Sequence, residues 1–303
     1  MSHLNAIIAS MRPYQWSKNI LLFAGLFFSL SLFNFPLVLK AFYGFLSFIM
    51  VSSSVYLFND LLDIEKDKLH PVKKNRPIPA GLVSKKEAIH LSIWLSIASL
   101  FIAVYFINNL FAYIIASYLI INVGYSCCLK NIVILDVFIV SMGFLLRTSA
   151  GIIAVDVPFS EWVIIATFLL ALLLSIGKRR GEIVNLQEKA VHHRKSLVNY
   201  SIGYVDNILN IVAASTIVTY ALYTLADETV ERFQTHMLIL TTPVVIYLLF
   251  RYLYLLQLRN QGEDPIKMIL KDKHLVIGGI FWVLMVAVII YLKLFLQFSF
   301  QSI

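Results

Sequence analysis

Charged residues are scarce in this sequence, and that scarcity excludes a water-soluble fold. Only 14% of the 303 residues are Asp, Glu, Lys or Arg, whereas 59% are hydrophobic. A typical soluble domain is about 25% charged and roughly 45–50% apolar, so this chain lacks the polar side chains to cover its apolar surface in water. Intrinsic disorder is excluded too, because it requires low hydrophobicity. The composition predicts an integral membrane protein.

Several common functional signatures are missing as well. The two cysteines, Cys127 and Cys128, are adjacent, which excludes a disulfide framework. The seven histidines show no metal-ligand spacing. No glycine-rich phosphate loop and no nucleophile-elbow motif is present. The net charge of +8 on so apolar a chain does not indicate nucleic acid; it suggests a cytoplasmic membrane face or sites for phosphorylated ligands.

Hydrophobic runs of the length that crosses a bilayer predict an all-α membrane protein of about nine transmembrane helices. No connection is long enough for a soluble domain, so residues 1–303 are expected to form one membrane-embedded domain. The first run is short and the fourth and fifth are tightly joined, which leaves eight or ten as alternative counts. The expected spans are Ile20–Phe35, Val38–Phe58, Ile89–Ile107, Leu110–Leu129, Ile132–Val155, Glu161–Gly177, Val205–Leu225, His236–Leu256 and Val276–Phe298.

The distribution of Lys and Arg predicts the orientation. Basic residues gather before the first span and in the loops after the even-numbered spans, whereas the other loops hold only Arg232. This asymmetry places the N-terminus in the cytoplasm and, with nine spans, the C-terminus outside. The two long loops, residues 59–88 and 178–204, are then cytoplasmic, and we expect them to cap an active site there.

Three aspartates at the end of the second span are spaced as on one helical face. Asp60, Asp63 and Asp67 are three and four residues apart. Carboxylates crowded at a membrane boundary repel one another, and Mg²⁺ would relieve the repulsion while leaving room for phosphate oxygens. We therefore expect these aspartates to bind Mg²⁺ and a diphosphate, although a merely solvated loop is the alternative. Nearby residues expected to contact the diphosphate are Asn59, Lys73, Lys74 and Arg76.

A second polar site follows the sixth span and has the opposite sign. Lys178, Arg179 and Glu182 lie there within one helical turn, and the planar fork of Arg179 suits phosphate oxygens. The alternative interpretation is a basic anchor that fixes topology. Charged groups inside or beside other spans are further substrate-binding candidates, with Lys18 equally suited to an interfacial anchor. These candidates are Lys18, Lys130, Asp136 and Arg147. For Arg147, which lies deeper in its span, a structural role is the alternative.

These motifs resemble the UbiA superfamily of intramembrane transferases, and within it the decaprenyl-phosphate phosphoribosyltransferases. The superfamily match is Asn59-Asp60-x-x-Asp63-x-x-x-Asp67 together with the span count. The narrower resemblance covers most of residues 12–200. It consists of Arg12-Pro13-x-Gln15-Trp16-x-Lys18-Asn19, His70-Pro71-x-Lys73-Lys74-x-Arg76, Asp136 to Arg147, Gly177-Lys178-Arg179-x-x-Glu182 and Arg194-Lys195-Ser196-Leu197. The pair Arg180-Gly181 departs from the pattern, and Arg180 is given no role.

The resemblance implies an enzyme that transfers 5-phosphoribose from 5-phosphoribosyl 1-diphosphate to a polyprenyl phosphate, with Mg²⁺, for cell-envelope polysaccharide synthesis. It implies a bacterial plasma-membrane location, an active site facing the cytoplasm, and Gln15 as a further substrate contact. Two alternatives are weighed against it. A prenyltransferase acting on an aromatic acceptor predicts a second acidic motif, which is missing. A transporter or scaffold predicts charges along a path through the membrane. A homo-oligomer is compatible with the sequence.

Overall fold

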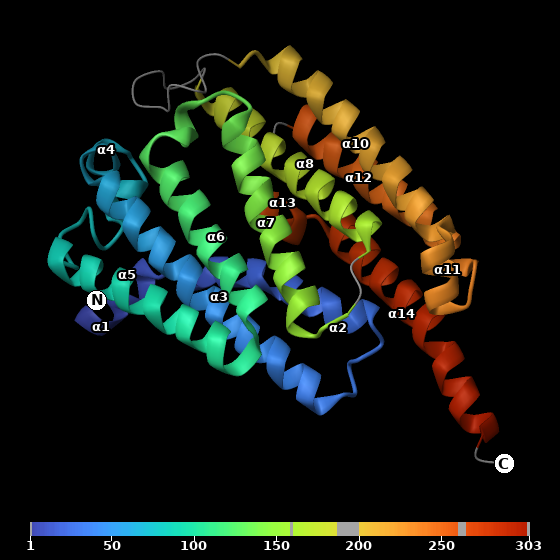
Figure 1. The fold of residues 1–303 in the computed structure, drawn as a ribbon. Helices are drawn as coiled ribbons and strands as arrows, with labels where there is room; N and C mark the ends of the chain where they lie inside the picture. Colours follow the sequence, from blue (N-terminus) through green and yellow to red (C-terminus); the bar gives the residue numbers. More distant parts are fainter. Residues whose placement is uncertain (1, 158–159, 187–199, 260–264, 302–303) are drawn as a thin grey trace. The chain divides into compact units, whose positions relative to one another are not determined.

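The computed structural model describes residues 2–157, 160–186, 200–259 and 265–301, and all regular elements in these ranges are helical (Figure 1). Eight helices of the described residues are long and apolar enough to cross a membrane. The chain divides into two compact units, an N-terminal unit that holds α1 to α7 and a C-terminal unit that holds α8 to α14. The expected all-α membrane fold is confirmed.

The N-terminal unit is built around the long helix α3. Figure 1 shows this helix running beside α5 and α6. The elements of the unit are α1 (His3–Ser10), η1 (Pro13–Phe23), α2 (Ala24–Phe28), α3 (Phe35–Leu62), α4 (Ile64–Leu69), η2 (Lys73–Asn75), α5 (Lys85–Ile102), η3 (Ala103–Ile107), α6 (Asn109–Cys127), η4 (Leu129–Asn131) and α7 (Leu135–Ala154).

Capping side chains decide where these helices begin. The side chains of Asn34 and Asn108 accept backbone N–H groups at the starts of α3 and α6. At the start of α5, Ser84 and Glu87 form a reciprocal capping box. Each cap satisfies N–H groups that a helix cannot pair internally. The starts of the helices are therefore fixed by short polar side chains in an otherwise apolar chain.

Serine side chains join α3 to α5 inside the unit. Ser47 and Ser99 are both fully buried, and each hydroxyl donates to the other's backbone carbonyl, at 3.0 and 2.9 Å. Ser54 and Ser92 form the same pair of hydrogen bonds about two turns further along α3, at 2.8 and 3.1 Å. In an apolar medium such small residues let helix backbones approach closely and supply interhelical hydrogen bonds. The pairs fix the position of α3 and hence of the aspartates at its end.

The first expected span, Ile20–Phe35, is not a continuous helix, so it is not among the eight long apolar helices of the described residues. Its residues divide between the 3₁₀ helix η1, the short α2 and a turn in which Leu30 has a left-handed φ of 62°. Gly151 of α7 explains the close packing of this segment, because a Cβ on Gly151 would lie 2.1 Å from the carbonyl oxygen of Leu22. The segment is pressed against α7 and ends where Asn34 starts α3.

The C-terminal unit contains α8 (Glu161–Leu186), α10 (Ile202–Leu225), α11 (Asp227–Phe233), η5 (Met237–Thr241), α12 (Thr242–Gln257), α13 (Pro265–Lys271) and α14 (Lys273–Gln301). The expectation that the sixth span ends at Gly177 is wrong, because α8 continues to Leu186. Gly177 serves close packing and not helix termination: a Cβ there would meet the hydroxyl of Tyr252 at 2.3 Å. Lys178, Arg179 and Glu182 are therefore helical residues and do not belong to a loop.

The start of α14 is capped by a side chain that also forms an ion pair. Asp272 accepts the backbone N–H of Leu275 at 2.9 Å and a hydrogen bond from Nη2 of Arg251 at 2.7 Å. The hydrogen bond from Arg251 is the main cause that lowers the pKa of the Asp272 carboxyl below its ordinary value. The ionised form of Asp272 therefore stabilises the junction of α13 and α14.

Candidate active site

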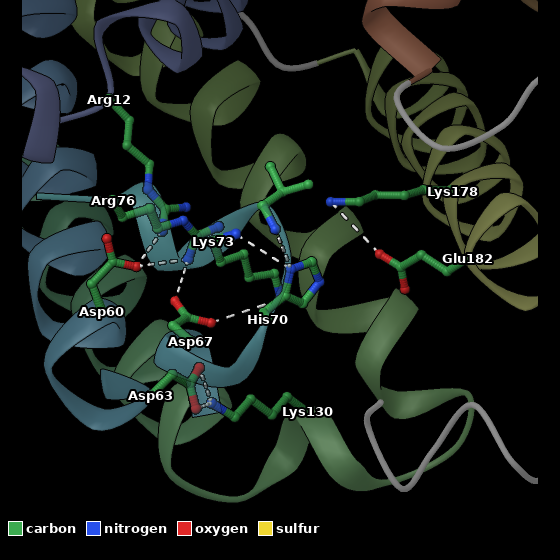
Figure 2. A network of polar contacts seen from close by, with 11 residues as sticks. Arg12, Asp60, Asp63, Asp67, His70, Lys73, Arg76, Lys130, Lys178 and Glu182 are labelled. Carbon is green, nitrogen blue, oxygen red and sulfur yellow. Dashed lines mark hydrogen bonds and ion pairs between the residues drawn. The ribbon is translucent and has the colours of Figure 1, made fainter. Parts of the chain in front are cut away.

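The three aspartates do not share one continuous helix. α3 ends at Leu62, Asp63 adopts a non-helical conformation, and α4 begins at Ile64. Asp60 and Asp67 are nevertheless brought together, because both accept hydrogen bonds from Nη1 of Arg76, at 3.0 and 2.6 Å (Figure 2). Asp60 and Asp67 are almost fully buried, at 1% and 4% exposure. The expected single face of three carboxylates is thus corrected to a pair around Arg76 with Asp63 facing another partner.

The loop after α4 carries Arg76 onto this pair. Ile78 and Val83 are buried in a core cluster with Ile64 of α4, so the loop folds back on the helices before it. Gly81 allows the reversal through its left-handed φ of 76°. The expected basic residues of this loop differ in their contacts: Nζ of Lys73 lies 3.9 Å from Asp67, whereas Lys74 is exposed.

Lys130 neutralises the third aspartate. Its Nζ donates to both carboxylate oxygens of Asp63, at 2.8 and 2.7 Å, and the two side chains are only 6% and 15% exposed. Lys130 lies in η4, between α6 and α7, where Ile134 has a left-handed φ of 71°. Positive φ is strained for a β-branched residue, so the connection holds a demanding geometry that places Lys130 against Asp63.

Arg12 belongs to the same cluster, and its role was missed from the sequence. Its guanidinium hydrogen-bonds Asp60 and lies 4.9 Å from the centre of the Tyr56 ring. Arg12 adopts a left-handed backbone conformation, with φ of 56°, just before Pro13 begins η1. The described structure therefore places four basic side chains on three carboxylates: Arg12, Lys73, Arg76 and Lys130 on Asp60, Asp63 and Asp67.

The segment after Arg12 lies along α3 and α7. Trp16 donates its indole N–H to Ser53 at 3.1 Å, and Nζ of Lys18 lies 5.7 Å from the centre of the Phe144 ring. The side-chain oxygen of Gln15 is buried and accepts no hydrogen bond from a described residue. Among the remaining candidates of this unit, Asn59 is half-buried one turn before Asp63, and Asp136 is fully buried in the first turn of α7.

Arg147 is buried in α7 at 4% exposure. Its Nε donates to Asn19 at 2.8 Å, its Nη1 to the carbonyl of Gly143 at 2.6 Å, and its Nη2 to the hydroxyl of Tyr118 at 2.7 Å. The partners Asn19 and Tyr118 come from η1 and α6, so Arg147 connects three elements of the N-terminal unit. No contact between Arg147 and Asp136 was expected, because they are three helical turns apart, and none of these partners is Asp136.

The basic motif of the C-terminal unit lies on α8. Arg179 hydrogen-bonds Glu182, and Nζ of Lys178 lies 4.0 Å from the same carboxylate; Figure 2 also draws the Lys178–Glu182 ion pair. The proximity of these three residues is confirmed. Arg194, Lys195 and Ser196, quoted in the resemblance, lie outside the described residues.

Arg180, which had no role in the sequence analysis, holds three helices together. Its Nε and Nη2 donate to the two carboxylate oxygens of Asp206 in α10, at 2.6 and 3.3 Å. The same guanidinium donates to the carbonyls of Leu256 and Gln257 at the end of α12. A cation at a helix C-terminus satisfies carbonyls that lack intrahelical partners and opposes the helix dipole. Arg180 is therefore a structural residue of α8.

The donor set partly fits the expected Mg²⁺. Among the described residues, no three His, Cys, Asp or Glu side chains are gathered as a metal-binding group. Asp60 and Asp67 do converge on one cationic nitrogen of Arg76, at hydrogen-bonding distance from both. Carboxylate oxygens arranged around one positive charge are the ligands that Mg²⁺ prefers. The pair fits a divalent cation in the place of that nitrogen, whereas Asp63 is held apart from the pair by Lys130.

Comparison with known proteins identifies the family. The model of the UbiA prenyltransferase family matches residues 19–282. The chain belongs to the UbiA prenyltransferase family. It is therefore a membrane transferase and a multi-pass integral membrane protein, as the eight apolar helices indicate.

Two curated relatives carry the same name. The decaprenyl-phosphate phosphoribosyltransferase of Mycolicibacterium smegmatis is 33% identical over 74% of this chain and 72% of its own length. That of Corynebacterium glutamicum is 28% identical over 95% of this chain and 87% of its own length. Both support the subfamily resemblance seen in the sequence.

The fold also matches solved structures of UbiA proteins. A UbiA homolog from Archaeoglobus fulgidus bound to GPP and Mg²⁺ superposes with a TM-score of 0.68, covering 93% of this chain and 97% of that one. The sequence identity is 21%, so the likeness establishes the fold alone. The predicted UbiA-like fold is confirmed.

Proposed function

We propose that this UbiA-family transferase moves 5-phosphoribose from 5-phosphoribosyl 1-diphosphate to a polyprenyl phosphate, releasing diphosphate. The observation that carries the proposal is the similarity to decaprenyl-phosphate phosphoribosyltransferases over most of the chain. The site agrees with a phosphorylated donor, because basic side chains outnumber the carboxylates around Asp60 and Asp67. The lipid product would serve as a precursor of cell-envelope polysaccharide.

The aspartates and basic residues of the N-terminal unit would hold the diphosphate. Mg²⁺ bound by Asp60, Asp67 and Asp63 would neutralise the diphosphate and stabilise its charge as it leaves. In this structure Arg76 and Arg12 donate hydrogen bonds to the carboxylates. Their guanidinium forks also suit phosphate oxygens. We infer that both turn from the carboxylates to the diphosphate when the donor binds, with Lys73 beside them.

No strong general base is needed for the proposed reaction. The acceptor phosphate is already an anion and attacks C1 of the ribose, while the bond from C1 to the diphosphate breaks with oxocarbenium character, as in glycosyl transfer generally. The residues therefore act by positioning and electrostatic stabilisation. Lys178 and Arg179 of α8 would bind a phosphate group, with Glu182 orienting both.

The membrane side of the site follows from the basic residues. Lys and Arg gather at the segments that precede the first expected span and follow the even-numbered ones, which supports a cytoplasmic position for the acidic site. The water-soluble donor would reach it from the cytoplasm, attracted by the basic surface, while the lipid tail remains against apolar helices.

The test is a transfer assay with purified protein. The protein is incubated with radiolabelled phosphoribosyl diphosphate, a polyprenyl phosphate and Mg²⁺, and label is counted in the extracted lipid. A parallel reaction offers labelled prenyl diphosphate and an aromatic acid. Label in the polyprenyl lipid supports the proposal. Alkylation of the aromatic acid, with no phosphoribosyl lipid formed, would instead identify a prenyltransferase.

Replacing Asp60 by Asn should abolish turnover, because the carboxylate is buried and lies where the metal would bind. Glu65→Gln is the matched control, since Glu65 is exposed and pairs only with the neighbouring Lys68, and it should retain activity. Folding is checked by the thermal transition in detergent. Near-normal turnover of a folded Asp60→Asn protein would disprove the metal assignment.

Lys178→Ala should mainly weaken substrate binding, because the Lys178 side chain is half exposed on α8. We expect a rise in KM of about tenfold, typical for the loss of one charge-assisted hydrogen bond. Lys271→Ala, an exposed lysine of α13, serves as the control. An unchanged KM for both substrates would reduce the basic motif of α8 to an anchor for topology.

A further inference from the structure

Arg147 is a buried cation without a counter-charge in the described structure. Its three hydrogen bonds go to an amide oxygen, a backbone carbonyl and a phenol, all of them neutral. No described carboxylate pairs with it. Three aromatic rings surround its guanidinium, those of Tyr118, Phe144 and Phe48, at 4.8, 5.7 and 5.8 Å from the ring centres.

These neutral contacts offset only part of the cost of burying a charge. Cation–π contacts and hydrogen bonds to neutral groups are individually modest, whereas a charge removed from water without a partner is strongly unfavourable. Charged residues inside membrane segments are therefore retained chiefly for function. The guanidinium also keeps binding capacity, because each of its two terminal nitrogens uses one of two N–H groups in the bonds described.

Tyr56 links Arg147 to the acidic cluster. It lies on α3 one helical turn before Asp60, with its ring 4.9 Å from the guanidinium of Arg12. The same helix carries Phe48, whose ring lies against the guanidinium of Arg147. The hydroxyl of Tyr56 makes no hydrogen bond with a described residue. A phenolic donor thus lies beside the arginine that contacts Asp60, on the helix that also packs against Arg147.

We propose that Arg147, together with the hydroxyls of Tyr56 and Tyr118, binds a phosphate monoester at a second position, apart from the diphosphate held at Asp60 and Asp67. The inference rests on the proposed function, in which both substrates carry such a group: the donor at its ribose 5-position and the lipid at its head. An Arg fork with two phenolic hydroxyls matches phosphate oxygens in number and type.

The same group sets donor specificity. A prenyl diphosphate anchored at the aspartates carries no second phosphate group that could pair with the buried cation of Arg147. A chain of CH₂ groups leaves that charge uncompensated, which disfavours the wrong donor. Arg147 therefore favours a donor that carries a second phosphate group over a prenyl diphosphate.

The experiment measures binding, so that it does not depend on turnover. Radiolabelled ribose 5-phosphate and, separately, radiolabelled farnesyl phosphate are equilibrated by dialysis with the purified full-length protein in detergent. The variants are Arg147→Met, Arg147→Lys and Tyr56→Phe. Because the Tyr56 hydroxyl has no described partner, Tyr56→Phe should fold normally even if Arg147→Met does not.

We expect Arg147→Met to weaken binding of one of the two ligands by about 10- to 100-fold and Tyr56→Phe by about tenfold. Arg147→Lys should recover part of the affinity, since it keeps the charge but loses the fork. The ligand whose binding is weakened identifies the phosphate. Weaker binding of ribose 5-phosphate assigns the position to the donor's 5-phosphate, and weaker binding of farnesyl phosphate assigns it to the lipid phosphate.

Two results would overturn the inference. One is wild-type protein that binds neither ligand; the other is unchanged binding of both ligands in folded Arg147→Met and Tyr56→Phe proteins. The transfer assay run on the same wild-type preparation tests the proposed function separately. If the wild-type protein transfers phosphoribose while the variants bind both ligands normally, the proposed function stands and only the second phosphate position is disproved.

Discussion

Replacing Lys130 by Met tests whether Asp63, which pairs with Lys130 in this structure, becomes a metal ligand when Mg²⁺ binds. The substitution keeps a long apolar side chain but removes the cation that both oxygens of Asp63 accept, at 2.8 and 2.7 Å. Removing one partner of a buried ion pair costs about 3–5 kcal/mol, because the other charge stays buried and unpaired. Asp63 keeps 15% of its side-chain exposure, so we expect the lower end, about 3 kcal/mol.

Mg²⁺ should reverse most of this loss if Asp63 is one of its ligands. A ligand that binds only the folded state at a hundred times its Kd stabilises that state by about 2.7 kcal/mol. Unfolding in detergent is therefore measured for wild type and Lys130→Met, each with a chelator and with saturating Mg²⁺. The variant should approach wild-type stability in Mg²⁺ and should respond to Mg²⁺ more strongly than wild type, in which Lys130 competes for Asp63.

The double variant Lys130→Met with Asp63→Asn separates charge from packing. With both charges removed, most of the stability should return without any metal, and Asp63 can no longer contribute to the Mg²⁺ response. The reasoning is refuted if Lys130→Met is equally destabilised in Mg²⁺ and in chelator. A double variant as unstable as Lys130→Met alone would show that lost packing, and not the unpaired carboxylate, causes the destabilisation.

Two further predictions concern the C-terminal unit. Arg180→Met should lower the free energy of unfolding by at most about 3 kcal/mol, since it leaves Asp206 unpaired but that side chain is 26% exposed. Arg180→Lys should recover only part because it lacks the fork; equal stability of both variants and wild type in denaturant titrations would contradict this. Asp272→Asn should lower stability at neutral pH. Because the folded-state pKa of Asp272 is lowered by Arg251, its contribution is complete above the ordinary carboxyl range and is lost as pH falls through the folded-state value. The difference between variant and wild type, followed by thermal unfolding from neutral pH to acid, should therefore shrink below about pH 4, and a constant difference would exclude the ion pair as its source.

The membrane helices could be predicted because hydrophobic length is a local property. Spans such as Val205–Leu225 and Leu110–Leu129 differ from α10 and α6 by only a few residues at their ends. A continuous first helix was predicted wrongly. Its residues are apolar enough for one, but they lie in a 3₁₀ helix and a turn packed against Gly151. The end of α8 was predicted too early because a glycine followed by charges resembles a helix terminus, whereas Arg180 bonds to α10 and α12 and so belongs to the packed helix.

The acidic motif could be predicted for a similar reason, since three aspartates at helical spacing are visible within eight residues. Their partners could not, because a contact between residues far apart in the chain has no local signal. Arg12 reaches Asp60 across 48 positions and Lys130 reaches Asp63 across 67. The break between α3 and α4, which separates Asp63 from the other two, also has no sequence signal, because the residues around it are all compatible with a helix.

The charge balance of the N-terminal unit limits what can bind there. Asp60, Asp63 and Asp67 already face more basic groups than they can neutralise, and Arg147 adds a buried charge with neutral partners only. A divalent cation alone would increase the positive excess and would have to displace Arg76 and Lys130. A phosphorylated ligand arriving with the cation removes both difficulties, because the displaced basic groups gain phosphate oxygens as new acceptors. In the wild-type protein, where Lys130 and Arg76 compete for the carboxylates, metal and polyanion should therefore bind cooperatively, each more weakly in the absence of the other.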